Sequence, residues 1–416
     1  MITVIGIIVG FLILMLLVVA HEFGHFIAAK RNGVEVEEFG IGFPPRAKAW
    51  VKNPEYIKWR AVKKSGKSVG DKPKKWLKLP KSEWGKPQKT LIFSLNWLPI
   101  GGFCSMKGES DSDERPHSFG AASLWAKTKI LFAGVAMNWL AAFIILTGLA
   151  ATGMPTFMDN QFTIASDAHI TPATVTVGKV IENSPAEHAG LKTGDQFIKV
   201  GDETVVTVDD IFNFNDAHAG ETVTYLMRVD GEDKPYEISL NNKDQEYVLG
   251  VYLDQSSLPT TRYTWSAPII GAVSTIQLTG ETYRGLGTMV GSLFSGITKQ
   301  FSGDEAVKQE GKEQIGTAGD SVSGPVGIIG VLFPASIQSG PTTLAFLAAI
   351  ISISLACMNV LPIPALDGGR FVLIALFRLR GKKLKKEIEE KIVSRTFIFL
   401  LILIAFVTIL DIIKFF

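Results

Sequence analysis

Cysteine and net charge are both scarce in this sequence of 416 residues. The chain contains only Cys104 and Cys357, too few for a disulfide framework or a cysteine-rich zinc site, and we expect both to be reduced, buried side chains. The formal net charge is +2, which gives no support to a nucleic-acid partner. A metal site in this protein must therefore be built from histidine and carboxylate ligands.

Apolar residues, by contrast, are abundant, and 47% of the chain is hydrophobic. A helix that spans a bilayer needs about 20 mainly apolar residues. Four stretches meet this requirement, at 1–29, 121–155, 339–360 and 394–416. The first lacks the basic start and the small-residue cleavage site of a signal peptide, so we expect it to be retained. The sequence predicts a polytopic α-helical membrane protein with four transmembrane helices.

Charged residues are distributed unevenly between the predicted spans. Residues 30–90 contain 17 Lys and Arg against 6 Asp and Glu, and residues 370–395 contain 9 against 3. The balance reverses over residues 155–262, with 7 against 18. Basic loops tend to remain in the cytoplasm. The loops 30–120 and 361–393 are therefore predicted to be cytoplasmic, and the acidic loop and both chain ends to lie outside.

Three segments between the predicted spans have distinct patterns. Residues 90–103, TLIFSLNWLPIGGF, combine strand-forming residues with a Pro-Ile-Gly-Gly turn, which predicts a re-entrant β-hairpin that dips into the membrane. Residues 168–260 alternate short strands with two helices, and the phrase SPAEHAGLKTGD resembles one bacterial PDZ domain of α/β type. Residues 261–338 are predicted to form a linker with a helix over 265–301 and a polar, mobile loop over 303–321.

Three polar residues with a high burial cost lie inside the first predicted span. His21, Glu22 and His25 form an H-E-x-x-H pattern. Positions i and i+4 share a helix face about 6 Å apart, so the two imidazoles can hold one zinc ion, with the glutamate placed as a general base. Polar residues that only line a helix bundle are the competing interpretation. The cost of ionisable groups within a span favours a functional site.

A catalytic zinc site needs a third protein ligand from a segment at the same depth. Asp367, in NVLPIPALDGGR, follows the third predicted span at the cytoplasmic side, where the topology also places His25. An exposed Asp-Gly-Gly turn is the competing interpretation, and the shared depth favours a ligand. The remaining histidines, in polar or outside segments, are His117, His169, His188 and His218.

Several motifs occur in one order along the chain: HEFGH, LPIGG, AGVAMNWLAA, the PDZ-like segment, SGPVGI and NVLPIPALDGG. Together they resemble the site-2 proteases, the bacterial intramembrane zinc metalloproteases of regulated intramembrane proteolysis, in their single-PDZ form. The resemblance covers nearly the whole chain. The lysine-rich stretch at about 50–88 is longer than in that pattern.

The resemblance implies a set of site residues. Zinc would be the cofactor, held by the two histidines of HEFGH and by Asp367, with Glu22 as the general base. Asn359 matches the family asparagine beside the site and would contact the substrate backbone, although a helix C-cap is an alternative role for it. Pro362 would keep the following segment extended for substrate binding.

The resemblance also implies a function and a location. The protein would cleave transmembrane segments of single-span substrates, such as remnant signal peptides or anti-sigma factors trimmed beforehand by an upstream site-1 protease. It would span the bacterial inner (cytoplasmic) membrane several times, with the PDZ-like domain extracytoplasmic and the active site near the cytoplasmic side. An unwound substrate could add as a strand to residues 90–103. The alternatives are a non-catalytic membrane PDZ scaffold and a zinc-dependent transporter.

Overall fold

The computed structural model describes residues 2–65, 69–84, 86, 88, 90–158, 160–255, 259–320 and 324–415. The chain forms two compact units. The first, called here the membrane unit, comprises Met1–Ile145 and Thr275–Phe416. The second, the inserted unit, comprises Leu146–Ser274.

Four helices are long and apolar enough to cross a membrane, as the sequence predicts. They are α1 (Ile2–Arg31), α3 (Leu124–Thr152), α10 (Pro341–Val360) and α12 (Lys386–Phe415). The predicted cytoplasmic loop 361–393 differs from expectation, because it contains α11 (Asp367–Leu379) and the start of α12. Helix α11 is too short to span a bilayer and has an apolar face, which packs on the apolar core that it shares with α1, α3 and two strands, β1 (Val36–Lys52) and β3 (Ile92–Met106).

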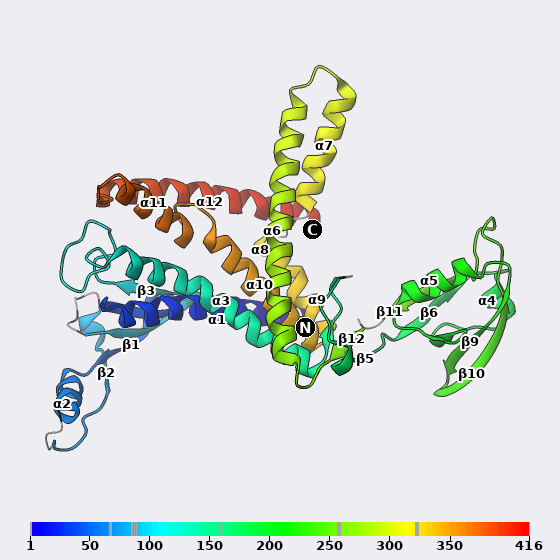
Figure 1. The fold of residues 1–416 in the computed structure, drawn as a ribbon, viewed down its shortest axis with the longest axis horizontal. Helices are drawn as coiled ribbons and strands as arrows, with labels where there is room; N and C mark the ends of the chain where they lie inside the picture. Colours follow the sequence, from blue (N-terminus) through cyan, green and yellow to red (C-terminus); the bar gives the residue numbers. More distant parts are fainter. Residues whose placement is uncertain are drawn as a thin grey trace. The chain divides into compact units, whose positions relative to one another are not determined.

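The predicted hairpin at 90–103 is part of a larger sheet. Strand β3 (Ile92–Met106) pairs with β1 (Val36–Lys52), which also pairs with β2 (Trp76–Lys78). Helix α2 (Pro54–Lys64) and the short helix η1 (Lys81–Glu83) lie between these strands in sequence. The partner of β3 is far away in sequence, so local turn signals could not identify it. Figure 1 shows β1 and β3 alongside α1.

Strands β1 and β3 pair twice because both are bent. Residues 102–106 pair with residues 36–41, whereas residues 92–95 pair with residues 38–41 on one side and with residues 48–51 on the other. Residues 92–95 are therefore interior to the sheet. Among the described strands, none pairs with the second side of residues 102–106, which form an open edge.

The bend of this sheet carries an exposed apolar surface. Trp97 is 70% exposed, and four other large apolar side chains near it are also exposed. These are Phe43, Leu95, Leu98 and Ile100. An exposed apolar group of this size on a sheet is typical of contact with lipid or a partner.

The predicted mobile loop at 303–321 is wrong for the described residues. Helix α7 (Glu305–Asp320) occupies this segment and pairs with α6 (Ala267–Gln300). The Lys299 Nζ donates to Glu310 Oε1 at 2.5 Å, and Asp304 Oδ1 accepts from the backbone N–H of Ala306. This cap and the cross-helix pairs outweigh the polar, glycine-containing sequence. Residue 321 lies outside the described residues.

A short helical segment precedes α10 in the membrane unit. It consists of α8 (Pro325–Gly327), η3 (Ile328–Leu332) and α9 (Phe333–Gln338). Helix α9 packs against α1 where Gly6 and Gly10 leave room for Pro334 and Phe333. The SGPVGI motif opens this helical segment, and the backbone N–H groups of its Gly324 and Gly327 donate to the carboxylate of Asp411 in α12.

The inserted unit contains a six-stranded sheet with two helices. The strand order is β10-β9-β7-β6-β11, with β8 paired to β7. The strands are β6 (Val175–Val180), β7 (Gln196–Val200), β8 (Glu203–Thr204), β9 (Thr222–Val229), β10 (Glu232–Ser239) and β11 (Val251–Gln255). The helices are α4 (Pro185–His188) and α5 (Val208–Ala217). Phe197, Ile211 and Tyr225 are the largest side chains of its core.

The chain enters and leaves this sheet at neighbouring points, because Val175, the first residue of β6, pairs with Gln255, the last residue of β11. A smaller sheet of β4 (Met154–Pro155), β12 (Thr260–Arg262) and β5 (His169–Thr171), with η2 (Ala165–Asp167), completes the inserted unit. The carboxylate of Asp167 accepts four hydrogen bonds from Thr264 and Ser266, just before α6 begins.

Candidate metal centre

Two glycines allow α1 and α3 to cross closely. A Cβ on Gly24 would lie 2.3 Å from the carbonyl oxygen of Ala133. A Cβ on Gly134 would lie 2.6 Å from the Nε2 atoms of both His21 and His25. Any side chain at these positions would push the helices or the rings apart. The backbone of α3 therefore lies directly against the histidine pair.

The structure brings His21, His25 and Asp367 together although the aspartate is more than 340 residues away in sequence. The Nε2 atom of His21 lies 3.0 Å from Asp367 Oδ2 and 3.1 Å from the Nε2 atom of His25. The distance from His25 Nε2 to Asp367 Oδ2 is 3.3 Å. Ligands of tetrahedral zinc, with bonds of about 2.0–2.2 Å, are about 3.3 Å apart. The donor set and its spacing fit zinc.

The rings of both histidines are oriented by α3. The Nδ1–H of His25 donates to the carbonyl oxygen of Ile130 at 2.8 Å, which leaves its Nε2 free for a metal. The Nδ1 atom of His21 lies 3.3 Å from the side-chain amide of Asn138. Both histidines are buried, with 8% and 6% of their surface exposed. The space in front of the Nε2 atoms, where Gly134 has no side chain, is one that a Cβ would fill.

Glu22 lies beside this group and contacts the open edge of the sheet. Its carboxylate lies near the backbone N–H of Cys104 in β3, and near both histidines and Asp367. Two residues further along β3, the backbone N–H of Met106 donates to Glu109 Oε1 at 2.9 Å. Backbone groups alternate in direction along a strand, so these two N–H groups point away from β1. The edge of residues 102–106 therefore faces Glu22.

Asp367 is the first residue of α11, and the two glycines after it explain the Asp-Gly-Gly sequence. A Cβ on Gly368 would lie 2.1 Å from the carbonyl oxygen of Val360, and one on Gly369 would lie 2.0 Å from that of Ile363. The chain can fold back on itself only without these side chains. Burial would raise the pKa of Asp367, but hydrogen bonds with His21 and His25 hold that pKa below its usual range. The carboxylate is thus ionised and suited to a cation.

A buried ion cluster fixes the segments around Asp367. The carboxylate of Asp111 pairs with Lys127 of α3 and with Arg378 of α11, and accepts from the backbone N–H of Leu384. Burial would raise the pKa of Asp111, but these hydrogen bonds hold it below its usual range. Glu389 of α12 in turn accepts from the Arg370 guanidinium at 3.0 Å and from the backbone N–H of Asp111. The cluster joins α3, α11 and α12 on the side where Asp367 lies.

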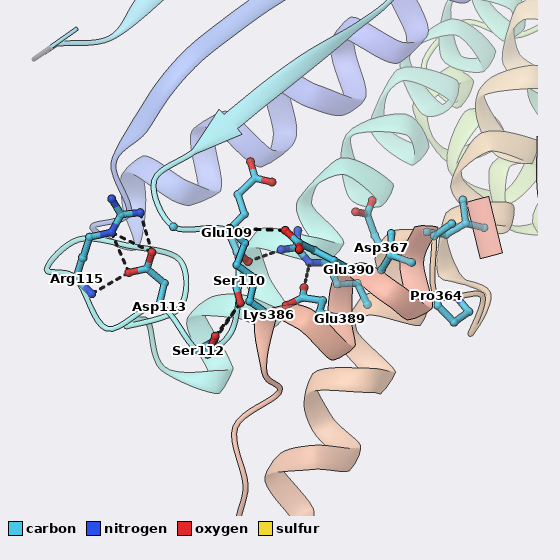
Figure 2. Close-up of a pocket in the computed structure, with 15 residues that line it drawn as sticks. Glu109, Ser110, Ser112, Asp113, Arg115, Pro364, Asp367, Lys386, Glu389 and Glu390 are labelled. Carbon is cyan, nitrogen blue, oxygen red and sulfur yellow. Dashed lines mark hydrogen bonds and ion pairs between the residues drawn. The ribbon is translucent and has the colours of Figure 1, made fainter. Parts of the chain in front are cut away.

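A polar cavity of about 670 Å³ extends to Asp367 (Figure 2). Its walls come from the segment after β3, from the segment before α11 and from the first turns of α12. Charged side chains dominate the lining, and those labelled in Figure 2 include Glu109, Asp113, Arg115, Lys386, Glu389 and Glu390. A polar, open cavity of this size can admit water to the carboxylate.

The two residues expected to bind substrate, Asn359 and Pro362, are not part of the His21–His25–Asp367 cluster among the described residues. Asn359 lies at the end of α10, where its amide donates to the carbonyl oxygen of Leu355 at 3.0 Å. The C-cap of α10 is Leu361, so Asn359 does not have the alternative capping role. Pro362 is exposed and is absent from the lining of the cavity, which contains Pro364. Asn138 and Gly134 also lie against the histidines and were not predicted from sequence, although both belong to the AGVAMNWLAA motif.

Comparison with known proteins agrees with the geometry. The sequence matches Peptidase family M50 over residues 9–60 and 77–404. It is 30% identical over 412 residues to a protein of Clostridium acetobutylicum that is named as a candidate zinc metalloprotease, covering 98% of this chain and 97% of the relative. Candidate zinc metalloproteases of Clostridium perfringens strain 13 (28% over 397 residues; 95% of each chain) and of Staphylococcus aureus strain COL (26% over 464 residues; 98% of each) are also similar.

These matches extend over nearly the full length of the chain and include both motifs that meet at the centre. They confirm the resemblance to the site-2 protease family, and with it the dependence on zinc. The chain belongs to the M50 peptidase family, the site-2 protease type of zinc metalloprotease.

Proposed function

We propose that this zinc metalloprotease cleaves the transmembrane segments of single-span membrane proteins, with His21, His25 and Asp367 as the zinc ligands. The observation that supports the proposal is the position of the three donor atoms, 3.0–3.3 Å apart, between two helices that are each apolar enough to span a membrane. Zinc bound there supplies Lewis acidity, which lowers the pKa of a water molecule and polarises the scissile carbonyl group.

Glu22 is the general base in this proposal. Its carboxylate lies near His21, His25 and Asp367. From there it can take a proton from the attacking water and pass it to the leaving amine. The cavity in Figure 2 reaches Asp367 through charged walls, so water would approach the centre from that side. Asn359, the penultimate residue of α10, is proposed to contact the substrate backbone, and Pro362 to keep the adjoining segment extended.

The substrate would bind as an added strand at residues 102–106. A helix hides its peptide bonds, so the substrate must unwind, and in lipid its backbone then needs new partners. The open edge of β3 offers such partners and faces Glu22. This position shifts the substrate from the whole of residues 90–103, the segment expected from sequence, to its end, because residues 92–95 are already paired on both sides.

Strand addition can be tested by disulfide cross-linking. The chain would carry Phe103→Cys or Ser105→Cys with both native cysteines replaced by alanine and with Glu22→Gln to prevent turnover. We expect cross-links to single cysteines placed along the substrate to recur at every second position, because side chains alternate along a strand. Leu77→Cys in β2, on the far side of the sheet, is the matched control and should give none. Cross-links that recur every three to four positions would show that the substrate binds as a helix instead.

The inserted unit is proposed to be a PDZ-like, extracytoplasmic domain that limits access of substrates with large ectodomains. Its six-stranded sheet with two short helices suits a peptide-binding domain of that kind. The basic residues favour a cytoplasmic position for residues 30–120 of a bacterial protein. In that orientation α1, α3, α10 and α12 would cross the inner membrane with the metal centre near the cytoplasmic side. An upstream site-1 protease would trim the ectodomain first.

Excision of the PDZ-like domain tests two points, the intramembrane position of the cut and the exclusion of untrimmed substrates. Residues 175–255 can be replaced by a short Gly-Ser linker, since Val175 and Gln255 are paired neighbours. We expect the full chain to cut a trimmed single-span substrate within its transmembrane segment and to leave the untrimmed form intact, whereas the excised variant should cut both. Mass spectrometry of the products locates the cut. An excised variant that cuts the trimmed form only would place substrate selection elsewhere, and cuts outside the transmembrane segment would contradict intramembrane cleavage.

The scaffold alternative does not explain the centre. A non-catalytic membrane PDZ scaffold would need neither the buried His21–His25 pair nor the Asp-Gly-Gly turn that brings Asp367 to it. A transporter would need polar groups that form a path along several spans. In α3, the buried amide is that of Asn138 and the buried cation is Lys127. Both side chains are directed to the centre or to the ion cluster next to it.

A further inference from the structure

One face of α3 carries the groups that contact both histidines. Ile130, Gly134 and Asn138 are spaced four residues apart, so they lie along one side of the helix. The Ile130 carbonyl oxygen accepts from His25, Gly134 leaves room for both Nε2 atoms, and the Asn138 amide lies 3.3 Å from His21 Nδ1. Asn138 is the only one of the three that acts through its side chain.

The protonation of His21 requires an acceptor at the position of the Asn138 amide. To bind a metal, His21 must leave Nε2 without a proton, so its proton lies on Nδ1 and needs an acceptor. The structure assigns Nδ2 of Asn138 to the position near Nδ1, which would bring two donors together. The oxygen and nitrogen of an amide are interchangeable in such an assignment. A half-turn of the amide places Oδ1 where it can accept from Nδ1–H.

The stability of the fold does not account for an asparagine here. Asn138 is 1% exposed, and the end of its amide that faces away from His21 has no hydrogen-bond partner among the described residues. A buried polar group without a partner is destabilising, and an apolar side chain of similar size would avoid that penalty. The helix contact at this point uses the backbone instead, since Ser352 Oγ of α10 donates to the carbonyl oxygen of Asn138. That bond would remain with any side chain at 138.

We propose that Asn138 is a positioning residue for His21: its amide oxygen accepts the Nδ1–H, fixes the tautomer and directs the Nε2 lone pair toward the metal. The inference rests on the proposed ligation of zinc by His21. It assigns a function to the asparagine of AGVAMNWLAA, which neither binds the metal nor contacts the substrate. For His25, the carbonyl oxygen of Ile130 accepts the Nδ1–H in the same way, and no side-chain substitution removes this backbone group.

The test compares zinc affinity in full-length Asn138→Leu and Asn138→Asp by competition with a chelator. Leucine removes the acceptor at nearly constant volume, and we expect the zinc dissociation constant to rise by about 10- to 100-fold. Aspartate keeps an acceptor oxygen and should bind zinc at least as tightly as wild type. The thermal unfolding midpoint of the zinc-free Asn138→Leu protein should equal or exceed that of the zinc-free wild type, because the unpaired amide is gone. A purely structural role would instead lower this midpoint.

Two further variants make each outcome informative. Ser352→Ala removes the adjacent backbone contact without touching the ring, so its zinc affinity should remain that of the wild type. His21→Ala should lose zinc, and if it binds zinc normally, the proposed ligand set itself is wrong. If His21→Ala loses zinc while Asn138→Leu binds it as tightly as wild type, only the positioning inference is overturned. Equal weakening in Asn138→Leu and Asn138→Asp, with a lower unfolding midpoint, would also overturn it.

Discussion

Glu22→Gln is expected to bind zinc as the wild type does and to cleave a single-span substrate about 10²- to 10⁴-fold more slowly. The glutamine keeps the shape of the side chain and can still contact the Cys104 backbone, but it cannot take a proton from water. Zinc content is unaffected because Glu22 is not one of the three clustered donors. The measurement is the single-turnover cleavage rate of detergent-solubilised protein, with bound zinc quantified on the same sample.

Glu114→Gln is the matched control for this substitution. Glu114 lies on the surface, where it pairs only with the exposed Lys383, so the same chemical change there should leave the rate unaltered. If Glu22→Gln retained more than about a tenth of the wild-type rate, Glu22 would not be the base. Loss of zinc from Glu22→Gln would mean that the carboxylate supports the metal rather than the proton transfer.

Gly134→Ala is expected to reduce zinc binding sharply and to lower cleavage by about 100-fold or more. The added Cβ would lie 2.6 Å from the Nε2 atoms of both His21 and His25, and the rigid imidazole rings can avoid it only by moving off the metal position. Displacements of about 1 Å in an active site typically cost about 100-fold in rate. Zinc stoichiometry and the cleavage rate report the two effects separately.

Gly148→Ala provides the control on the same helix. No atom lies within 4 Å of the Cβ that it would add, so both zinc content and rate should be unchanged. The substitution should favour the helix by up to about 1 kcal/mol, because alanine has the higher helix propensity. A Gly134→Ala protein with full zinc and full rate would show that α3 is farther from the histidines than the structure has it.

The cluster of His21, His25 and Asp367 could be predicted from sequence because its pattern is local or fixed by depth. His21 and His25 follow from helical spacing alone, and Asp367 follows from the topology that the charges impose. The groups that orient the ligands could not be predicted in this way. The Ile130 carbonyl oxygen has no side-chain signature, and a glycine or asparagine inside an apolar helix looks like a packing residue until its neighbour is known.

The fold was predictable to a similar extent. The apolar helices were expected because length and hydropathy are sufficient signals for a span. The pairing of β3 with β1 was not, since residues 36–52 carry no strong alternation and their partner is about 50 residues away. Helix α7 was missed because its pattern is polar, and only its contacts with α6 explain its stability. Long-range pairing decides these elements, and a single sequence does not display it.

The pairing of Val175 with Gln255 also bears on how the membrane unit can assemble. The two parts of that unit are separated in sequence by the whole of Leu146–Ser274, and a flexible loop of this length would carry a substantial entropic cost of closure. Once the sheet from β6 to β11 has folded, its ends are neighbours, and the residues it contains no longer lengthen the connection. The connection that remains is formed by the shorter segments on either side, so early folding of the insert would favour docking of α10 and α11 onto α1 and α3.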